Sequence, residues 1–478
     1  MALGALSAAA LAGFLIFPVY ANYDSMYHLA WAREILGGSL PGFDDTRAPT
    51  EHPLWLALCV LLAPLGGVAD RVLVAICIGC FVATVAGLYS LGKAVFSPLV
   101  GAIAAVLLLT RLDFAFLAAR GYVDVAYLAL LIWAAVLEVR RPRRGGAVWV
   151  LLALAGLLRP EGWVLAALYA VYLGRRTDWA RRARCAAYAA VGPGIWAAVD
   201  LAVTGDPMYS LNYTTESAAT LGRRKDLIEL PGTMLHYLDL LTKWPVLLAG
   251  TVGVGLAAWL ARDRLLVPLT LLTVGLGTFL GSSLRGFSVI YRYLMPAALI
   301  VMLFAAFALA APRWLPAGSA LRRPLSVGAV LLALAAGGFS ATNFSTRSIT
   351  NELALRGSVR EQLASLLAQP AVRDARSCGP VSLPNHKLVP DVRWVLDSDA
   401  QEVLPRTTRP EGGRDDDGVA IFIFGAFKFL KHQAYGPFDQ EEDSPLIQVP
   451  AAGAVRVAST RNFVAYVRCA PGGTTATG

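Results

Sequence analysis

The chain has 478 residues, of which 56% are hydrophobic and only 16% are charged. Its mean hydropathy of +0.56 excludes a set of ordinary soluble domains, and its long apolar runs predict a polytopic membrane protein. A net charge of +9 would suggest a nucleic-acid partner in a soluble protein, but in a membrane protein the placement of Lys and Arg matters more than their sum. We therefore predict membrane lipids, and no nucleic acid, around this chain.

The first apolar run, MALGALSAAALAGFLIFPVY, covers residues 1–20. It lacks the basic n-region and the small-residue cleavage site of a signal peptide. Because about 20 apolar residues span a bilayer as a helix, we predict that this run is a retained first transmembrane helix. A polar stretch follows it and begins a long outer loop over residues 21–70.

Basic residues in short loops set the predicted topology, because Lys and Arg of membrane proteins gather on the cytoplasmic side. Only one true span then fits between the first outer loop and Lys93. Residues 71–92 are continuously apolar, whereas 53–67 are short and interrupted by Pro and Gly, which favours a membrane-surface helix for 53–67. The pattern predicts about eleven transmembrane helices within residues 1–340 and a second long outer loop at 204–243. Besides Lys93, the residues placed in the cytoplasm are Arg140, Arg141, Arg143, Arg144, Arg175, Arg176, Arg181, Arg182, Arg184, Arg262, Arg264, Arg313, Arg322 and Arg323.

The last part of the chain, residues 341–478, is more polar and has a different pattern. Two short runs rich in β-branched and aromatic residues, 418–427 and 462–469, are typical of strands. We predict a small extracytoplasmic α/β or α+β domain that serves as a structural cap, with acceptor binding as the alternative. Its first segment predicts an amphipathic helix, with a stripe formed by Leu353, Leu355, Val359, Leu363, Leu366 and Leu367.

Two of the six cysteines, Cys378 and Cys469, bracket this C-terminal region. Because the region is predicted to face an oxidising compartment, the two are a candidate disulfide pair. The other four cysteines lie in apolar segments, where small buried side chains are expected. Cys77 and Cys80 have the spacing of metal ligands, but no second pair or His accompanies them there.

Charged residues concentrate at the predicted outer ends of the spans. Asp24 follows the first span, Asp124 opens another, and the RPEG sequence at 159–162 forms a third outer turn, while Arg285 and Arg292 precede a later span. Taken singly, each could be a solvated helix end or a cation that extends toward lipid headgroups. Together they predict a polar pocket at the outer membrane surface.

Such a pocket suits sugar transfer from a lipid phosphate. A carboxylate can act as a general base on an acceptor hydroxyl, and arginine binds phosphate. Because a phosphate neutralised by cations is already a good leaving group, one acid suffices, whereas glycoside hydrolysis requires two carboxylates.

The stretch YDSMYHLAWAREILGG followed by TEHPLW resembles the first outer loop of the GT-C superfamily, integral membrane glycosyltransferases that use polyprenyl-phosphate sugars. The LLRPEGW and GDPMYSLNYTTESAATLGRR stretches are similar to arabinofuranosyltransferase-like and mannosyltransferase-like bacterial members. The chain departs from that pattern at Tyr23–Asp24, where paired acids are common, and at His52, where Asn often precedes PLW. The resemblance covers about the first 300 residues and leaves open whether the enzyme is a hexosyl- or pentosyltransferase.

The resemblance implies catalytic roles for two acids. Asp24 matches the superfamily's catalytic acid and is expected to activate the acceptor hydroxyl, and Asp124 matches the assisting acid and is expected to orient acceptor or sugar. The donor would be a polyprenyl-phosphate sugar. The acceptor would be an envelope glycan, lipid or protein outside the plasma membrane.

The remaining candidates are substrate-binding residues: Tyr27, His52, Arg159, Glu161, Arg223, Arg224, Arg285 and Arg292. Several have a structural alternative. His52 could cap the surface helix instead of contacting the donor, and Arg159 with Glu161 could form a structural ion pair. Arg223 and Arg224 could form a solvated face rather than capture phosphate.

The residues identify no certain cofactor. Asp44 and Asp45 could hold Mg²⁺ or Mn²⁺, as the resemblance to the oligosaccharyltransferases of this superfamily implies, but the FDDT sequence is also an ordinary turn.

Two other classes of function remain open. A membrane transporter or a lipid or glycan flippase would instead need charges at mid-bilayer depth, and usually internal repeats. A catalytically idle scaffold that recruits envelope partners is a third class.

Overall fold

A computed structural model describes residues 2–45, 47–220, 222–343, 345–384, 386–406, 417–423 and 450–469. The chain forms two compact units. The helical unit contains Met1–Phe14, His52–Trp55 and Val74–Arg347, and the mixed unit contains Leu15–Glu51, Leu56–Leu73 and Ser348–Gly478. The predicted domain boundary at 340/341 stays a prediction, and the mixed unit includes residues 15–51 in addition to the C-terminal region.

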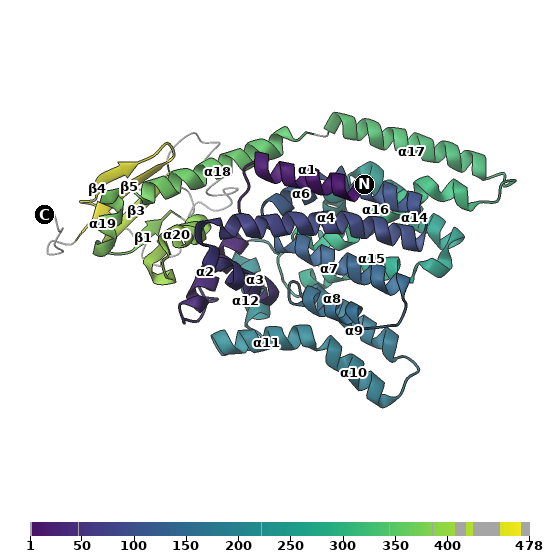
Figure 1. Cartoon of the computed structure of the whole chain (residues 1–478), viewed down its shortest axis with the longest axis horizontal. Coiled ribbons are helices and arrows are strands. Elements are labelled where there is room, and N and C mark those ends of the chain that lie inside the picture. Colours follow the sequence, from purple (N-terminus) through teal and green to yellow (C-terminus); the bar gives the residue numbers. More distant parts are fainter. Residues whose placement is uncertain are drawn as a thin grey trace. The chain divides into compact units, whose positions relative to one another are not determined.

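The helical unit is a bundle of apolar helices (Figure 1). Its centre is α16, whose side chains are almost all buried and which packs against α5, α14 and α15. The α-helices that lie wholly or mostly in this unit are α1 (Ala2–Ile16), α4 (Ala69–Val95), α5 (Pro98–Leu109), α6 (Leu112–Ala119), α7 (Val123–Arg140), α8 (Ala147–Gly156), α9 (Glu161–Gly174), α10 (Trp179–Ala189), α11 (Val191–Thr204), α12 (Tyr209–Thr220), α13 (Leu230–Thr242), α14 (Trp244–Leu260), α15 (Leu266–Leu284), α16 (Met295–Ala310) and α17 (Arg322–Asn343).

Glycine permits the closest helix packing in this unit. A Cβ atom on Gly253 of α14 would lie 2.0 Å from the carbonyl oxygen of Phe304 on α16, and one on Gly250 would lie 2.6 Å from Val301. Small residues at such contacts let helix backbones approach each other, which strengthens van der Waals packing where lipid supplies no hydrophobic drive. The tight α14–α16 contact therefore depends on these two glycines.

Four helical segments of the described chain are long and apolar enough to cross a membrane, or up to seven if each bent helix pair counts as one span. The four are Pro53–Val95, Leu266–Leu284, Tyr291–Trp314 and Arg322–Thr342. The polytopic helical class is thus confirmed, while the count of about eleven stays a prediction.

Residues 53–67, predicted as a surface helix, form α3 (Pro53–Leu62) and most of a 3-10 segment, η1 (Ala63–Val68). Gly66 has a positive φ of 61° and interrupts the helical backbone before α4 begins. Straight helix over the 43 residues of Pro53–Val95 would be about 65 Å long, roughly twice the apolar thickness of a bilayer. The segment is therefore too long to cross the bilayer as one straight helix, which explains a break near Gly66. The position of α3 at the membrane surface stays a prediction.

The mixed unit combines α2 (Tyr23–Leu36) with the C-terminal domain, whose predicted mixed character is confirmed. Its sheet has the order β2-β1-β3-β5-β4, in which β1 pairs in parallel with β2 and β3, and β5 pairs antiparallel with β3 and β4. The predicted stripe on α18 is buried except at Leu355, which is 37% exposed. The elements are α18 (Arg347–Leu367), α19 (Pro370–Asp374), β1 (Val381–Leu383), α20 (Val389–Leu396), β2 (Val403–Pro405), β3 (Gly418–Ile423), β4 (Val455–Ser459) and β5 (Phe463–Arg468).

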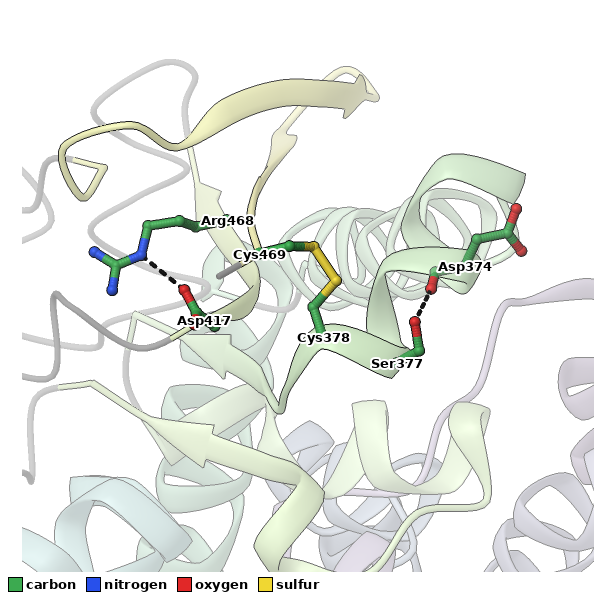
Figure 2. The surroundings of a disulfide bond; sticks show 6 residues. All are labelled: Asp374, Ser377, Cys378, Asp417, Arg468 and Cys469. Atoms are coloured by element: carbon green, nitrogen blue, oxygen red, sulfur yellow. Dashed lines mark hydrogen bonds and ion pairs between the residues drawn. A yellow bond between two sulfur atoms is a disulfide. The ribbon is translucent and has the colours of Figure 1, made fainter. Parts of the chain in front are cut away.

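A disulfide joins Cys378 to Cys469, with 5.3 Å between the Cα atoms, so the two predicted partners are paired (Figure 2). It links the segment after α19 to the end of β5. Beside it, Arg468 of β5 forms an ion pair with Asp417, 2.9 Å from Nε to Oδ1. Both contacts fasten the last strand to the rest of the sheet.

Candidate active site

The helical unit holds a buried carboxylate between two arginines. Asp124 lies in the first turn of α7 and is 2% exposed. Its Oδ1 is 3.1 Å from Nη1 of Arg159, and its Oδ2 accepts a hydrogen bond from Nη1 of Arg292 at 2.7 Å. Removing charges from water is costly unless they are paired, so the three groups stabilise one another. Residues 124, 159 and 292, all predicted for the site, thus meet in space.

The arginines are held by further contacts. Nη2 of Arg159 donates to Oε1 of Glu161 at 3.2 Å, and its guanidinium lies 4.7 Å from the ring centre of Tyr293. The guanidinium of Arg292 lies 4.7 Å from the ring centre of Tyr122. Aromatic faces attract cations and keep their planes in place. Both arginines are therefore oriented as well as charge-balanced.

A small cavity of about 10 Å³ adjoins this cluster, enough for one water molecule. Asp124, Arg159, Glu161, Arg292 and Tyr293 all line it. Among the described residues, Nε of Arg159 and Oε2 of Glu161 are buried without a hydrogen-bond partner. Since buried polar atoms are normally hydrogen-bonded, these two atoms mark a place where a polar ligand would be accommodated.

His52, another predicted site residue, lies within electrostatic reach of Asp124. Its ring is buried and meets the edge of Trp196, with 5.9 Å between ring centres. The amide of Leu54, two residues later, donates to the carbonyl of Leu157 at 3.2 Å. The start of α3 is thereby fixed to the turn that carries Arg159.

The other predicted basic residues form a separate, exposed group in the helical unit. The carbonyl of Arg223 accepts a hydrogen bond from the amide of Val289, and the guanidinium of Arg224 donates to the carbonyls of Gly286 and Thr215. Arg285 lies at the end of α15, one residue before Gly286. The structure thus brings residues 223, 224 and 285 onto two loops that hydrogen-bond to each other.

Asp24 belongs to the mixed unit, in the first turn of α2. Asn22 caps this helix, because its Oδ1 accepts from the amide of Ser25 at 3.2 Å. The Asp24 carboxylate is half-buried and makes no hydrogen bond or ion pair within the described part of the chain. The partial positive charge of a helix N-terminus favours a carboxylate at this position.

The rest of α2 has an aromatic core. Tyr27 is 1% exposed and packs between Tyr23 and Trp31, at 5.0 and 5.5 Å between ring centres. Nδ1 of His28 donates to the Asp24 carbonyl at 2.7 Å, and burial lowers the pKa of His28 to about 4. In this unit Tyr27 is therefore a packing residue beside the helix turn that carries Asp24.

The predicted metal pair lies in a different setting. Asp44 is exposed, while Oδ2 of Asp45 is 2.6 Å from Nη1 of Arg393. No group of three or more His, Cys, Asp or Glu side chains with metal-binding geometry occurs among the residues that the structure describes. Asp45 thus has a cation as its partner, and the alternative of a metal at Asp44 and Asp45 stays untested.

Solved structures were found that share this architecture. The first is ArnT from Cupriavidus metallidurans bound to undecaprenyl phosphate, with a TM-score of 0.58, 13% identity and 98% of each chain covered. The apo state of the same protein aligns with a TM-score of 0.57, 15% identity and 96% of each chain. The chain has the GT-C fold. The alignment with ArnT covers residues of both the helical and the mixed unit. No family model and no curated protein matches the sequence.

Several residues of these clusters were missed from sequence. Tyr293 directly follows Arg292 in the YRYLMP stretch, and that adjacency is the signal that could have found it. Glu34 and Arg393 are 359 positions apart and pair in the mixed unit. Nothing in the local sequence at either position indicates the contact, since the two residues lie on helices far apart in the chain.

Proposed function

We propose that this chain is a glycosyltransferase of the plasma membrane that moves a sugar from a polyprenyl-phosphate donor to an envelope glycan, lipid or protein acceptor on the outer face. The observation that carries the proposal is the pair of oriented arginines, Arg159 and Arg292, which line a small cavity. Beside it, Nε of Arg159 and Oε2 of Glu161 are buried without a hydrogen-bond partner. The GT-C fold supports it, and the ArnT neighbour was solved with undecaprenyl phosphate.

In the proposed reaction the acceptor hydroxyl attacks the anomeric carbon of the donor sugar. The bond from that carbon to the phosphate oxygen breaks, and its electron pair leaves with polyprenyl phosphate, whose negative charge increases by one unit. Arg159 and Arg292 would stabilise the added negative charge, because fixed donors aimed at developing charge lower the barrier. The hydroxyl proton passes to the carboxylate of Asp24.

The environments of the two predicted catalytic acids suit different roles. Both oxygens of Asp124 accept from guanidinium groups, so Asp124 is better suited to orient Arg159 and Arg292 than to take a proton. Asp24 has no ion-pair partner among the described residues and stays available as a base. We therefore assign Asp24 to proton removal and Asp124 to positioning.

The test uses membranes that contain the overexpressed full chain and radiolabelled synthetic polyprenyl-phosphate mannose or polyprenyl-phosphate arabinofuranose. We expect label to enter envelope material and polyprenyl phosphate to accumulate, above membranes with an empty vector. An Asp24→Asn protein expressed at the same level should lack this excess. Translocation of intact labelled donor without sugar release would instead support a flippase and contradict the proposal.

The outer location of the site can be tested by labelling single cysteines with a membrane-impermeant thiol reagent. Position 44, which is exposed on the segment between α2 and α3, should react from outside intact cells. Positions 142 and 180, which are exposed in the predicted cytoplasmic loops, should react only after permeabilisation. The reverse pattern would overturn the orientation.

A further inference from the structure

Arg393 of α20 is a buried arginine that the proposed chemistry does not use. It is 1% exposed, and its two terminal nitrogens contact two different acids of the first outer loop. Nη1 lies 2.6 Å from Asp45, and Nη2 donates to Oε1 of Glu34. Its Nε faces the carbonyl of Ser398. All of these groups lie in the mixed unit, so the contacts join the C-terminal domain to α2 and the loop behind it.

The acids that meet Arg393 also fix the end of α2. Oε2 of Glu34 accepts from the amide of Gly42 at 3.1 Å, and the carbonyl of Gly42 accepts from Nε1 of Trp31 at 3.0 Å. Burial raises the pKa of both Glu34 and Asp45, while the charge of Arg393 opposes that rise. Two half-buried acids in one place thus share one cation.

Neighbouring residues repeat the link between α2 and α20. Arg33 donates to the carbonyl of Trp394 at 2.6 Å, lies over the Trp394 ring at 3.4 Å, and pairs with Asp397 at 3.1 Å. The side chain of Arg393 also lies 5.8 Å from the ring centre of Tyr27 on α2. Tyr27, Arg33 and Glu34 of α2 therefore all contact α20 or the residue that follows it.

A second arginine of the C-terminal domain contacts the same helix. Arg360 of α18 pairs with Asp391 of α20 at 3.5 Å and with Asp70 at the start of α4. Its Nη2 lies 3.4 Å from the sulfur of Met26, two residues after Asp24. The first turn of α2 is thereby braced by α18 while its last turn is held by α20.

We propose that Arg393 is a positioning residue, through which the C-terminal domain holds α2 and so sets the place of the Asp24 carboxylate. This inference rests on the proposed function, since it takes Asp24 as the base. The C-terminal domain then has a role in turnover, in contrast to the passive cap expected from sequence. A lysine at 393 keeps the charge but offers a single point charge in place of the planar fork that reaches two carboxylates.

The experiment compares Arg393→Lys with Arg373→Lys, a matched control in the same domain whose arginine is exposed and, among the residues that the structure describes, forms an ion pair only with the adjacent Asp374. Hydrogen–deuterium exchange of the full chain should become faster in peptides covering 23–36 for Arg393→Lys and stay unchanged for Arg373→Lys. Exchange in α7 should be unchanged in both variants.

The second readout is transfer per folded molecule, with molecules counted by stoichiometric binding of undecaprenyl phosphate. For Arg393→Lys we expect kcat to fall about tenfold to a hundredfold, because a small misplacement of a reacting group has an effect of that size. The affinity for undecaprenyl phosphate should not change, which separates positioning from a mere loss of folded protein.

If Arg393→Lys does not fold, Asp45→Asn removes one charged partner only and should show the same split with a smaller loss of kcat. Unchanged exchange in α2, or faster exchange with an unchanged kcat, would overturn the inference. Absence of transfer by the wild-type protein would instead overturn the proposed function, while exchange in α2 would still report whether Arg393 holds that helix.

Discussion

The surroundings of Asp124 and Asp24 differ more than their sequence contexts do. Each acid begins a helix at the predicted outer end of a span. Asp124 is buried between two guanidinium groups, whereas Asp24 is half-buried, with no ion pair in the described part of the mixed unit. A buried carboxylate that is paired with arginines has a fixed geometry, whereas a carboxylate without an ion pair can accept a proton.

This difference separates positioning from proton transfer in one proposed reaction. An acid whose oxygens are both occupied by arginine holds those arginines ready for a phosphate. An acid at a helix N-terminus without such partners can accept a proton and release it to water.

Replacing Asp24 with Asn should reduce sugar transfer by about 10²–10⁴-fold, the range that general-base catalysis supplies. The measurement is initial rate per folded molecule with labelled polyprenyl-phosphate donors. Glu361→Gln is the matched control, because Glu361 is an exposed acid of the same mixed unit, and its rate should equal that of the wild type. Equal losses in both variants would show that net charge, and not a base at 24, matters.

Replacing Arg292 with Met should weaken binding of undecaprenyl phosphate by about tenfold to a hundredfold, the worth of one or more hydrogen bonds to a charged group. Titration of purified protein in nanodiscs measures the Kd. Arg262→Met changes an arginine that is 83% exposed in its side chain and should leave the Kd unchanged. If both variants bind equally well, the phosphate lies elsewhere.

Replacing Cys378 with Ser should lower the stability of the C-terminal domain by about 2–4 kcal/mol, since the disulfide closes a loop between positions 91 apart. Thermal unfolding of the purified chain measures the change in Tm. Reducing agent should produce the same decrease in the wild type and none in Cys378→Ser. A wild-type Tm that does not respond to reduction would contradict a stabilising role.

The smallest effect is expected for His28, which should make the free energy of unfolding decrease at acid pH. Burial lowers its pKa to about 4 in the folded state, so the unfolded chain takes up a proton first as the pH falls below about 6.5. The free energy of unfolding should therefore decrease between about pH 6.5 and 4, by about 2 kcal/mol at pH 5. His28→Asn keeps a donor for the Asp24 carbonyl and should lack this part of the decrease in Tm. If Tm falls equally with pH in the wild type and in His28→Asn, His28 does not contribute to the acid sensitivity.

The sequence was sufficient for the fold class because apolar length and polar interruptions are local signals. It also named all four charged residues of the Asp124 cluster, since each lies at a helix end where charge is conspicuous against an apolar background. It could not show that Asp124 pairs with Arg292, which is 168 positions away. The sequence also could not show that Asp45 and Glu34 contact Arg393. That arginine lies in a polar domain, where a single arginine does not stand out from the other charged residues.

The most direct test of the division of labour compares Asp24→Asn with Asp124→Asn by two measurements on the same preparations, kcat for sugar transfer and Kd for undecaprenyl phosphate. We predict that Asp24→Asn loses turnover while its Kd stays within about twofold of the wild type. Asp124→Asn should raise the Kd, because its arginines lose the charge that orients them. Wild-type turnover in Asp24→Asn, or lost turnover with unchanged binding in Asp124→Asn, would contradict the account.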